Sequence, residues 1–346
     1  MKRRICYLVI LILLAAMVTA CSTQSSTPGS ETPATGKELQ EEIKPMKWVI
    51  SAGDTEDYYM AKFMKVWMDK VTEKSNGAIT GEIYYGGQIG YAADAYESLD
   101  MGNMHIYFDG VSAGSEVSDV YNVLGLPYLY ENKDHQNRFW DTYFKEATDY
   151  MAKESGYRVV GVVDGLNREA TMNIPINSMA DFKNKKIRVP AMDSFIQMWE
   201  AFGAKAVPIG FYETFTAIQT GVVSGQENDI ALSKSAGFFE VAPYLIMTDH
   251  NSYEGGIFMS EQYYQSLPEA VKKVMEEVNL EVYAESKEFC KTLEKEIIEE
   301  LKTKGVTVMY PDQAPFKEAA KVLYENPGLK NYQKLFELID KASSRH

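Results

Sequence analysis

Cysteine and histidine are both scarce in this sequence. Its 346 residues include only three cysteines and four histidines, and the histidines are scattered along the chain (His105, His135, His250 and His346). No CxxC, HExxH or EF-hand pattern occurs. Those spacings are typical of redox dithiols, zinc sites and calcium sites. We therefore predict that the protein has no metal site and no cofactor.

Positive charge is also in short supply. Lysine and arginine number 35 against 49 aspartates and glutamates, so the formal net charge is -14. A field of this sign repels nucleic acid and anionic lipid, and we exclude nucleic acid as a partner. An anionic ligand would need a few local cationic groups to overcome that field.

A membrane-spanning run is missing as well. The apolar stretch from Ile5 to Ala20 is shorter than the ~20 residues that a transmembrane helix needs. A basic tripeptide at positions 2–4 precedes it, and small residues and Cys21 follow it, as in a bacterial lipoprotein signal. We predict a signal peptide over residues 1–20, lipidation of Cys21, and a flexible tether rich in Ser, Thr and Pro over residues 21–45. The alternative is an ordinary secretory signal with a chance cysteine.

Either signal would export the chain. With Cys21 lipidated, the protein would be anchored on the outer face of the cytoplasmic membrane; otherwise it would be free in the periplasm. Besides Cys21, processing leaves Cys290 alone, which we expect to be a small buried apolar residue in a helix rather than half of a disulfide.

Strand-like and helix-like segments alternate from residue 47 onward. Predicted strands cover 48–51, 79–85, 104–108, 158–163, 186–189, 206–207 and 222–223, with helices at 60–71, 92–101 and 314–324 and others that begin near 192 and 212. This alternation favours an α/β fold with a largely parallel sheet in each of two lobes. A single helical pattern runs from Pro268 to Lys304, long enough to bridge both lobes.

One short pattern suggests catalysis. Residues 110–114 read Gly-Val-Ser-Ala-Gly, which matches the G-x-S-x-G nucleophile elbow of serine hydrolases and follows a predicted strand. An elbow leads straight into a helix, whereas the sequence that follows here is not helical in pattern, and no histidine has a distinctive setting. We therefore favour a loop at a cleft, where Ser112 donates a hydrogen bond, and keep a serine hydrolase as the less favoured alternative.

Two arginines stand in places where a charge needs an explanation. Arg168 lies just after a predicted strand, and Arg188 lies inside the apolar strand 186–189. Such a charge must pair, snorkel or face a polar cavity. A planar guanidinium suits a ligand carboxylate, although an internal salt bridge is the alternative. Asn228, in a polar cluster after a predicted strand, lies where α/β folds place ligand-binding groups.

Several segments together resemble the solute-binding subunit of tripartite ATP-independent periplasmic (TRAP) transporters. They are Glu-Lys-Ser-Asn-Gly at 73–77, Gly-Gln-Ile-Gly at 87–90, Leu-Pro-Tyr-Leu-Tyr at 126–130, Lys-Ile-Arg-Val-Pro at 186–190, the stretch 211–221, Gly-Gln-Glu-Asn at 225–228 and Ser-Leu-Pro at 266–268. Their order and spacing also fit, over roughly 47–326. The chain departs from the family pattern at Asn167, usually aromatic, at Ser224, usually Asp, and at Asp229, usually Pro.

This resemblance implies a two-lobed fold like that of type II periplasmic binding proteins. The lobes would comprise approximately 46–165 with 254–293, and 166–253 with 294–346. It further implies a ligand site in which Arg188 grips a carboxylate, Arg168 assists from the lobe boundary, Asn228 completes the anchor and Phe211 flanks the ligand. We place Ser112, Asp109 and Gln88 in the same site, since Asp109 would suit a hydroxyl-bearing ligand such as a sugar acid.

The expected function is therefore binding, not catalysis. We expect a monomer that captures a small organic carboxylate, a C4-dicarboxylate or a sugar acid, and delivers it to TRAP membrane subunits for uptake driven by an ion gradient. A binding protein for an ATP-driven importer or a sensor kinase is the main alternative.

Overall fold

A computed structural model describes residues 43–343. The predicted signal peptide, Cys21, nearly all of the predicted tether and His346 lie outside the described residues. Within them, nine strands form one sheet in the order β2-β1-β3-β8-β4-β7-β5-β6, and β9 pairs with β8. The strands are β1 (Met46–Ala52), β2 (Ile79–Tyr84), β3 (Ile106–Gly110), β4 (Tyr157–Met172), β5 (Lys186–Val189), β6 (Lys205–Pro208), β7 (Gly225–Asp229), β8 (Tyr244–Ser260) and β9 (Thr307–Met309).

Helices cover both faces of this sheet, and no helix of the described residues is long and apolar enough to cross a membrane. The α-helices are α1 (Tyr59–Lys74), α2 (Ala93–Asp100), α3 (Lys133–Ser155), α4 (Asp193–Ala201), α5 (Thr214–Gln219), α6 (Ile230–Ser235), α7 (Glu261–Ser266), α8 (Glu269–Thr303), α9 (Ala314–Tyr324) and α10 (Gln333–Lys341).

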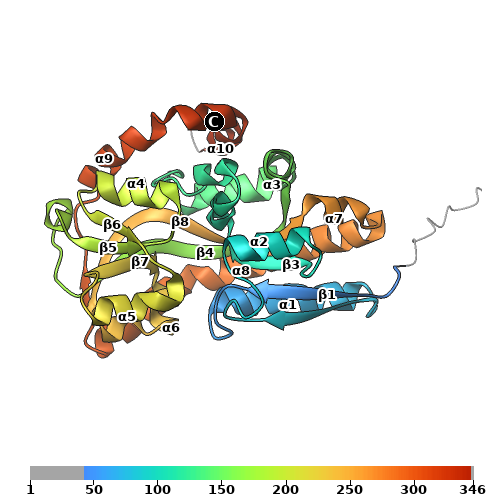
Figure 1. Cartoon of the computed structure of the whole chain (residues 1–346), viewed down its shortest axis with the longest axis horizontal. Helices are drawn as coiled ribbons and strands as arrows, with labels where there is room; N and C mark the ends of the chain where they lie inside the picture. The colour runs from blue at the N-terminus through green and yellow to red at the C-terminus, as the bar shows by residue number, and fades with distance from the viewer. Residues whose placement is uncertain (1–42, 344–346) are drawn as a thin grey trace, which may run out of the picture. The chain divides into compact units, whose positions relative to one another are not determined.

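Two long antiparallel strands, β4 and β8, run through the middle of the sheet (Figure 1). On one side lies the parallel group β2-β1-β3, which we call the first half, and on the other the parallel group β7-β5-β6, the second half. The pairings that join each half to the long strands are antiparallel. The prediction of a parallel sheet in each lobe thus holds for the outer strands and is wrong at the centre, because β4 and β8 belong to both halves.

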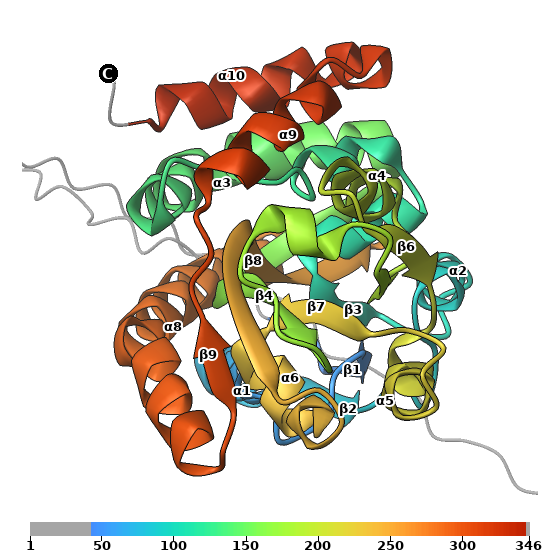
Figure 2. The same cartoon turned by 90° about the vertical axis from the view of Figure 1, so that its left-hand side faces the viewer.

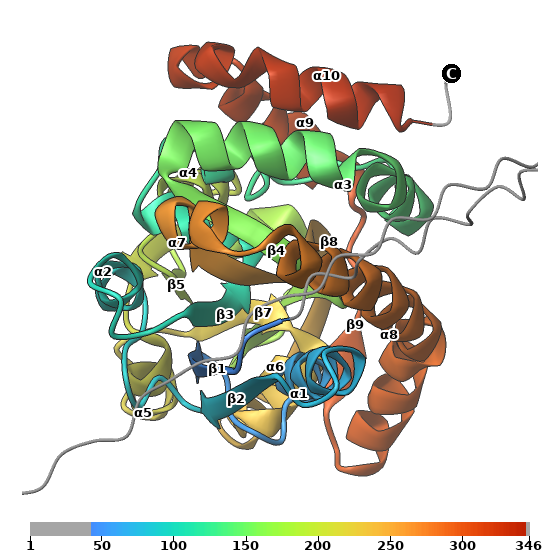
Figure 3. The ribbon, with the colours of Figure 1, turned by 90° about the vertical axis from the view of Figure 1, so that its right-hand side faces the viewer.

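The two faces of the sheet carry separate hydrophobic cores. Along β4, the neighbours Val159 and Val160 pack into different cores, and so do Val162 and Val163, as expected when successive side chains point to opposite faces. An irregularity in the pairing between Val159 and Gly161 shifts this alternation, so that Val159 and Val162 share one core. Helices α3, α4, α9 and α10 cover one face, and α1 and α8 cover the other (Figures 2 and 3). A strand buried on both faces reads as a continuous apolar run, which is why β4 was predictable in its first part.

Helix α8 confirms the predicted long helix and contacts elements of both halves. Near its start, Lys74 of α1 pairs with Glu281 at 2.9 Å. Near its end, Glu300 forms an ion pair with Lys234 of α6. The α-helix α10, in the segment predicted to belong to the second lobe, packs against α3 of the first, where Arg138 Nε donates to the Ala342 carbonyl at 2.9 Å.

Some local predictions are wrong or incomplete. Residues 222–223 form no strand; β7 begins at Gly225 because the chain turns first. Helix α3 and strand β8 were not predicted at all: the polar stretch at 248–252 hides the period of β8, and α3 has a low apolar content. Directly after β3, Val111–Glu116 form a 3-10 helix, η1, whereas residues 124–128, further along, form turns and bends as predicted.

Candidate functional site

A small cavity between the two halves brings together most of the predicted site residues. Its volume is about 50 Å³. Of the predicted residues, Arg188, Arg168, Asn228, Phe211, Ser112 and Asp109 line it. Residues that were not predicted complete the lining: Asp54, Tyr91, Gly110, Ala113, Glu116, Pro190, Met192, Leu232 and Tyr253. Gln88 is exposed and does not line it.

Arg188 is a buried cation that forms no ion pair with any of the described residues. Its strand, β5, lies between β6 and β7, and Arg188 is in register with Gln226 of β7. Only 3% of Arg188 is exposed. Nε donates to the Ile209 carbonyl at 2.7 Å. Its two terminal nitrogens make no hydrogen bond or ion pair with any residue between 43 and 343. Burial lowers the pKa of Arg188 to about 10. The guanidinium is therefore fixed by one hydrogen bond at the cavity, and its two terminal nitrogens are left without a hydrogen bond from residues 43–343.

Arg168 is in the opposite situation. Its Nε and Nη2 donate to the two carboxylate oxygens of Glu227 at 2.7 and 2.8 Å, a bidentate pair buried on neighbouring strands β4 and β7. His250 lies within 3.1 Å of the same carboxylate. Burial opposes the charge on Arg168, but Glu227 outweighs it and raises the pKa of Arg168. Arg168 is thus neutralised within the protein and can assist a ligand only through its remaining N–H groups.

Asn228 is fixed by its neighbour Gln226, whose Oε1 accepts a hydrogen bond from Asn228 Nδ2 at 2.9 Å. The next residue, Asp229, replaces the proline usual in the family. Its Oδ1 accepts from the backbone N–H of Ala231 and Leu232 at 2.8 and 2.9 Å, which caps α6. The departure at 229 therefore has a structural role that leaves the Asn228 amide at the cavity.

Three acidic residues from the first half also line the cavity. Asp109, in β3, accepts hydrogen bonds from Tyr107 Oη at 2.6 Å and from the Gly110 N–H at 2.7 Å. Asp54 follows β1 and is 7% exposed; its pKa is raised by burial and then by Asp109. Glu116 ends η1; burial and Asp109 raise its pKa to about 7, and its buried Oε2 has no hydrogen-bond partner among the described residues.

Aromatic residues close the cavity and tie the halves together. Phe211 packs edge-on against Tyr212, with ring centroids 5.5 Å apart. Tyr212, from the second half, meets Tyr91 of the first at 5.6 Å and donates its hydroxyl to the Gly53 carbonyl. These contacts exist only when the halves are together, so the structure represents a closed arrangement.

The Gly-x-Ser-x-Gly match has a packing explanation. A Cβ on Gly110 would lie 2.4 Å from the ring of Tyr253, and one on Gly114 would lie 2.5 Å from the ring of Tyr121. Each glycine is therefore required by a neighbouring tyrosine. The described histidines hydrogen-bond elsewhere: His105 accepts from the Val49 N–H, His135 contacts the Ile339 carbonyl, and His250 contacts Glu227.

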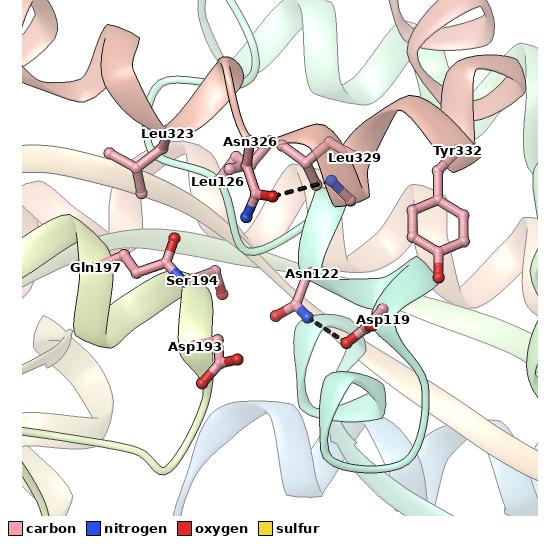
Figure 4. Close-up of a pocket in the computed structure, with 11 residues that line it drawn as sticks. Asp119, Asn122, Leu126, Asp193, Ser194, Gln197, Leu323, Asn326, Leu329 and Tyr332 are labelled. Atoms are coloured by element: carbon pink, nitrogen blue, oxygen red, sulfur yellow. Dashed lines mark hydrogen bonds between the residues drawn. The ribbon is translucent and has the colours of Figure 1, made fainter.

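Two other cavities are less suited to a carboxylate. One, of about 140 Å³, is lined by Asp119, Asn122, Asp193, Ser194 and other polar and apolar residues but by no cation (Figure 4). The other is an open groove of about 710 Å³ between α3 and α8. Several cations there already pair with acids, such as Lys287 with Asp141 at 2.5 Å. Of these three cavities in the described part of the chain, the one lined by Arg188 is the one with a buried guanidinium whose terminal nitrogens have no hydrogen-bond partner.

Comparison with known proteins identifies the family. The sequence profile of the bacterial extracellular solute-binding proteins of family 7 matches residues 50–331. The chain belongs to that family. The resemblance to TRAP solute-binding subunits is thereby confirmed. Members of the family are binding proteins, and the fold is the predicted two-lobed α/β fold.

Three similar proteins illustrate how the named ligands differ from one protein to another. The sialic acid-binding periplasmic protein SiaP of Vibrio cholerae is 31% identical over 263 residues, covering 75% of this chain and 82% of SiaP. The C4-dicarboxylate-binding periplasmic protein DctP of the same organism is 26% identical over 221 residues, covering 63% of this chain and 67% of DctP. A TRAP periplasmic solute-binding protein from Roseobacter denitrificans, solved with bound β-D-glucuronate, has a TM-score of 0.79 and 25% identity and covers 85% of this chain and 99% of its own.

Proposed function

We propose that this family 7 protein captures a small organic carboxylate through Arg188 and delivers it to TRAP membrane subunits. The observation that carries the proposal is the buried guanidinium of Arg188, which has a free binding edge and no acidic partner among residues 43–343. A buried charge is costly unless it is paired. A ligand carboxylate would supply that partner and satisfy two parallel N–H donors.

The relatives support a carboxylate but leave its kind open. The named ligands of the three relatives are sialic acid, C4-dicarboxylates and glucuronate, all of which carry a carboxylate. Arg168 would assist and Asn228 would add an amide donor, whereas Phe211 and Ser112 would complete the wall.

Ligand binding would hold the two halves together. A ligand that contacts both halves favours the state in which they are closed, and the membrane subunits would recognise that state. We further propose that Cys21 carries the lipid that keeps the protein at the membrane surface, and that the protein works as a monomer without a catalytic step.

A thermal-shift screen tests the carboxylate proposal. The panel would contain dicarboxylates, uronates, aldonates, sialic acid, keto acids and amino acids, each with a neutral analogue that lacks the charge. A ligand at 100 times its Kd adds about 2.7 kcal/mol of stability. We expect at least one carboxylate to stabilise the wild type and to lose that effect with Arg188→Met. Stabilisation by the neutral analogues alone, or an unchanged shift with Arg188→Met, would refute the proposal.

A further inference from the structure

A second cavity lies where the two halves meet, and it shares no lining residue with the cavity of Arg188 (Figure 4). One side is formed by the 3-10 helix η2 (Asp119–Val123), which comes after β3 of the first half. The other side is the start of α4, which connects β5 to β6 of the second half. Its volume is about 140 Å³, and since a water molecule needs only about 10–15 Å³, a ligand of several atoms fits.

Two buried oxygen atoms at this cavity have no hydrogen-bond partner. Ser194, in the first turn of α4, is 6% exposed, and its Oγ atom makes no hydrogen bond in the part of the chain that the structure describes. Asn122 donates from Nδ2 to Asp119 Oδ1 at 3.2 Å, which leaves its own Oδ1 atom buried and unpaired among the same residues. Figure 4 shows both oxygens directed into the space between α4 and η2. Buried polar atoms are nearly always paired in native proteins, so these two indicate a missing partner.

The charged groups of the lining are all negative. They are the carboxylates of Asp119 and Asp193, and no lysine, arginine or histidine lines the cavity. The Asp193 carboxylate makes no hydrogen bond or ion pair with residues 43–343. Asp193 lies in the first turn of α4, where the helix dipole favours a negative charge. That accounts for the aspartate but not for the two unpaired oxygens beside it.

These features together fit a ligand that donates hydrogen bonds and carries a positive charge. An ammonium group has three N–H donors and no acceptor. Leu126, Leu323 and Leu329 also line the cavity and offer apolar surface to methylene groups. A hydrated inorganic ion would gain nothing from that surface, and the described residues contain no group of three His, Cys, Asp or Glu side chains that could hold a metal ion.

We propose that this cavity is a second ligand site, which binds the primary ammonium group of a small free amine through Ser194, Asn122 and Asp193. These contacts come from both halves, so a bound amine favours the arrangement in which the halves are together. A carboxylate at Arg188 would favour the same arrangement, and the two ligands should then raise each other's affinity by the same factor. The amine site itself does not depend on the proposed function; only this coupling does.

Calorimetry on the carboxylate-free protein tests the site directly. The probes are n-butylamine, ethanolamine and 1,4-diaminobutane as chloride salts at one ionic strength, which keeps the screening of charges equal. The controls are n-butanol, which is neutral, and tetramethylammonium, a cation without N–H donors. We expect saturable 1:1 binding of at least one primary amine and of neither control. Binding of no primary amine, or equally tight binding of tetramethylammonium, would overturn the proposal.

A lysine side chain of another protein carries the same ammonium group as a free amine. Nα-acetyl-L-lysine N-methylamide represents that source in the same titration. We expect it to bind more weakly than the tightest free amine, because its two amide groups add bulk at a cavity of this volume. Tenfold tighter binding of this lysine analogue would overturn the assignment to a small amine.

Variants assign the binding to this cavity. Ser194→Ala and Asn122→Leu each remove a hydrogen bond to a charged group and should weaken amine binding at least about 10-fold. Asp193→Asn should weaken it about 2- to 5-fold, because water screens the exposed carboxylate. The control is Glu200→Gln, which removes an exposed charge near the other end of α4, outside the lining, and should leave the dissociation constant unchanged. Unchanged binding by both Ser194→Ala and Asn122→Leu would overturn the proposal.

The coupling is measured with the carboxylate that the screen supplies. Saturating amine should lower the dissociation constant of the carboxylate at least about fivefold, the lower end of typical coupling factors, and the carboxylate should lower that of the amine equally. Unchanged constants would show that the site does not bridge the halves. Arg188→Met should abolish carboxylate binding and leave amine binding intact. If no carboxylate binds while an amine does, the proposed function is wrong and the ammonium site stands.

Discussion

Replacing Arg188 by methionine should make the ligand-free protein more stable. Burial lowers the pKa of Arg188 from its ordinary value to about 10. Each pKa unit corresponds to about 1.4 kcal/mol, so burial of the charge costs about 3 kcal/mol. Methionine has a similar length and no charge. It would lose the hydrogen bond to the Ile209 carbonyl, about 1 kcal/mol. The net expectation is a gain of about 1–2 kcal/mol in the free energy of unfolding.

Arg168 provides the matched comparison, because it is equally buried but paired. Arg168→Met would leave the carboxylate of Glu227, which is fully buried, with His250 as its remaining side-chain contact. Removing one partner of a buried ion pair costs about 3–5 kcal/mol. The two arginine variants should therefore shift stability in opposite directions.

Urea denaturation followed by circular dichroism measures both effects without ligand. The expected order of unfolding free energies is Arg188→Met, then wild type, then Arg168→Met. If Arg188→Met is destabilised by as much as Arg168→Met, the Arg188 side chain is a structural element of the strand and the reasoning fails.

Four further predictions concern single residues. Burial raises the pKa of Glu116 from 4.5 to about 7, so the folded state retains a proton that the unfolded state has released; stability should fall from about pH 4.5 to 7, and Glu116→Gln should flatten that fall in Tm. Tyr212→Phe removes the hydrogen bond to the Gly53 carbonyl and should weaken binding by about 2- to 10-fold, mainly through faster dissociation, in stopped-flow measurements. Cys21→Ala should move the protein from the membrane pellet to the soluble fraction. Ser112→Ala should leave ester and amide turnover at background and weaken ligand binding by no more than about 10-fold.

Each of these has a result that would contradict it. A Tm that falls equally with pH in wild type and in Glu116→Gln would exclude Glu116 as the titrating group. An unchanged dissociation rate for Tyr212→Phe would mean that this contact does not hold the closed state. Full pelleting of Cys21→Ala would contradict lipidation, and saturable hydrolysis that disappears with Ser112→Ala would make the protein an enzyme.

The sequence predicted the structure best in segments whose local residue pattern matches the place that the segment takes in the fold. The strand at 186–189 has the predicted bounds, because an apolar run bounded by lysines and a proline is a strong local signal. The arginine inside that run stood out for the same reason: a charge among buried apolar residues needs a cavity. Helix α9 also has its predicted bounds.

The sequence was least informative about pairs that are distant along the chain. Arg168 and Glu227 are separated by 59 positions, and nothing in either segment indicates that they meet. Asp54, Asp109 and Glu116 are brought to the cavity from three segments in the same way, and of these three only Asp109 was predicted. Strand β8 escaped prediction because its polar central stretch reads as a loop, although the pairing with β4 keeps most of it buried. The topology of the sheet determines which of these distant residues meet. The local periodicity of a sequence carries no information about that topology.

The most direct test of the central claim is calorimetry of the ligand found in the screen against wild type, Arg188→Met and Arg188→Lys. Truncating one partner of a buried hydrogen-bonded charge pair costs about 2–5 kcal/mol, so Arg188→Met should weaken binding by roughly 30-fold to several thousand-fold. Arg188→Lys should recover little of it, because an ammonium cannot reproduce two parallel hydrogen bonds. Binding by Arg188→Met within about threefold of wild type would contradict the account, because Arg188 would then not be the group that holds the carboxylate.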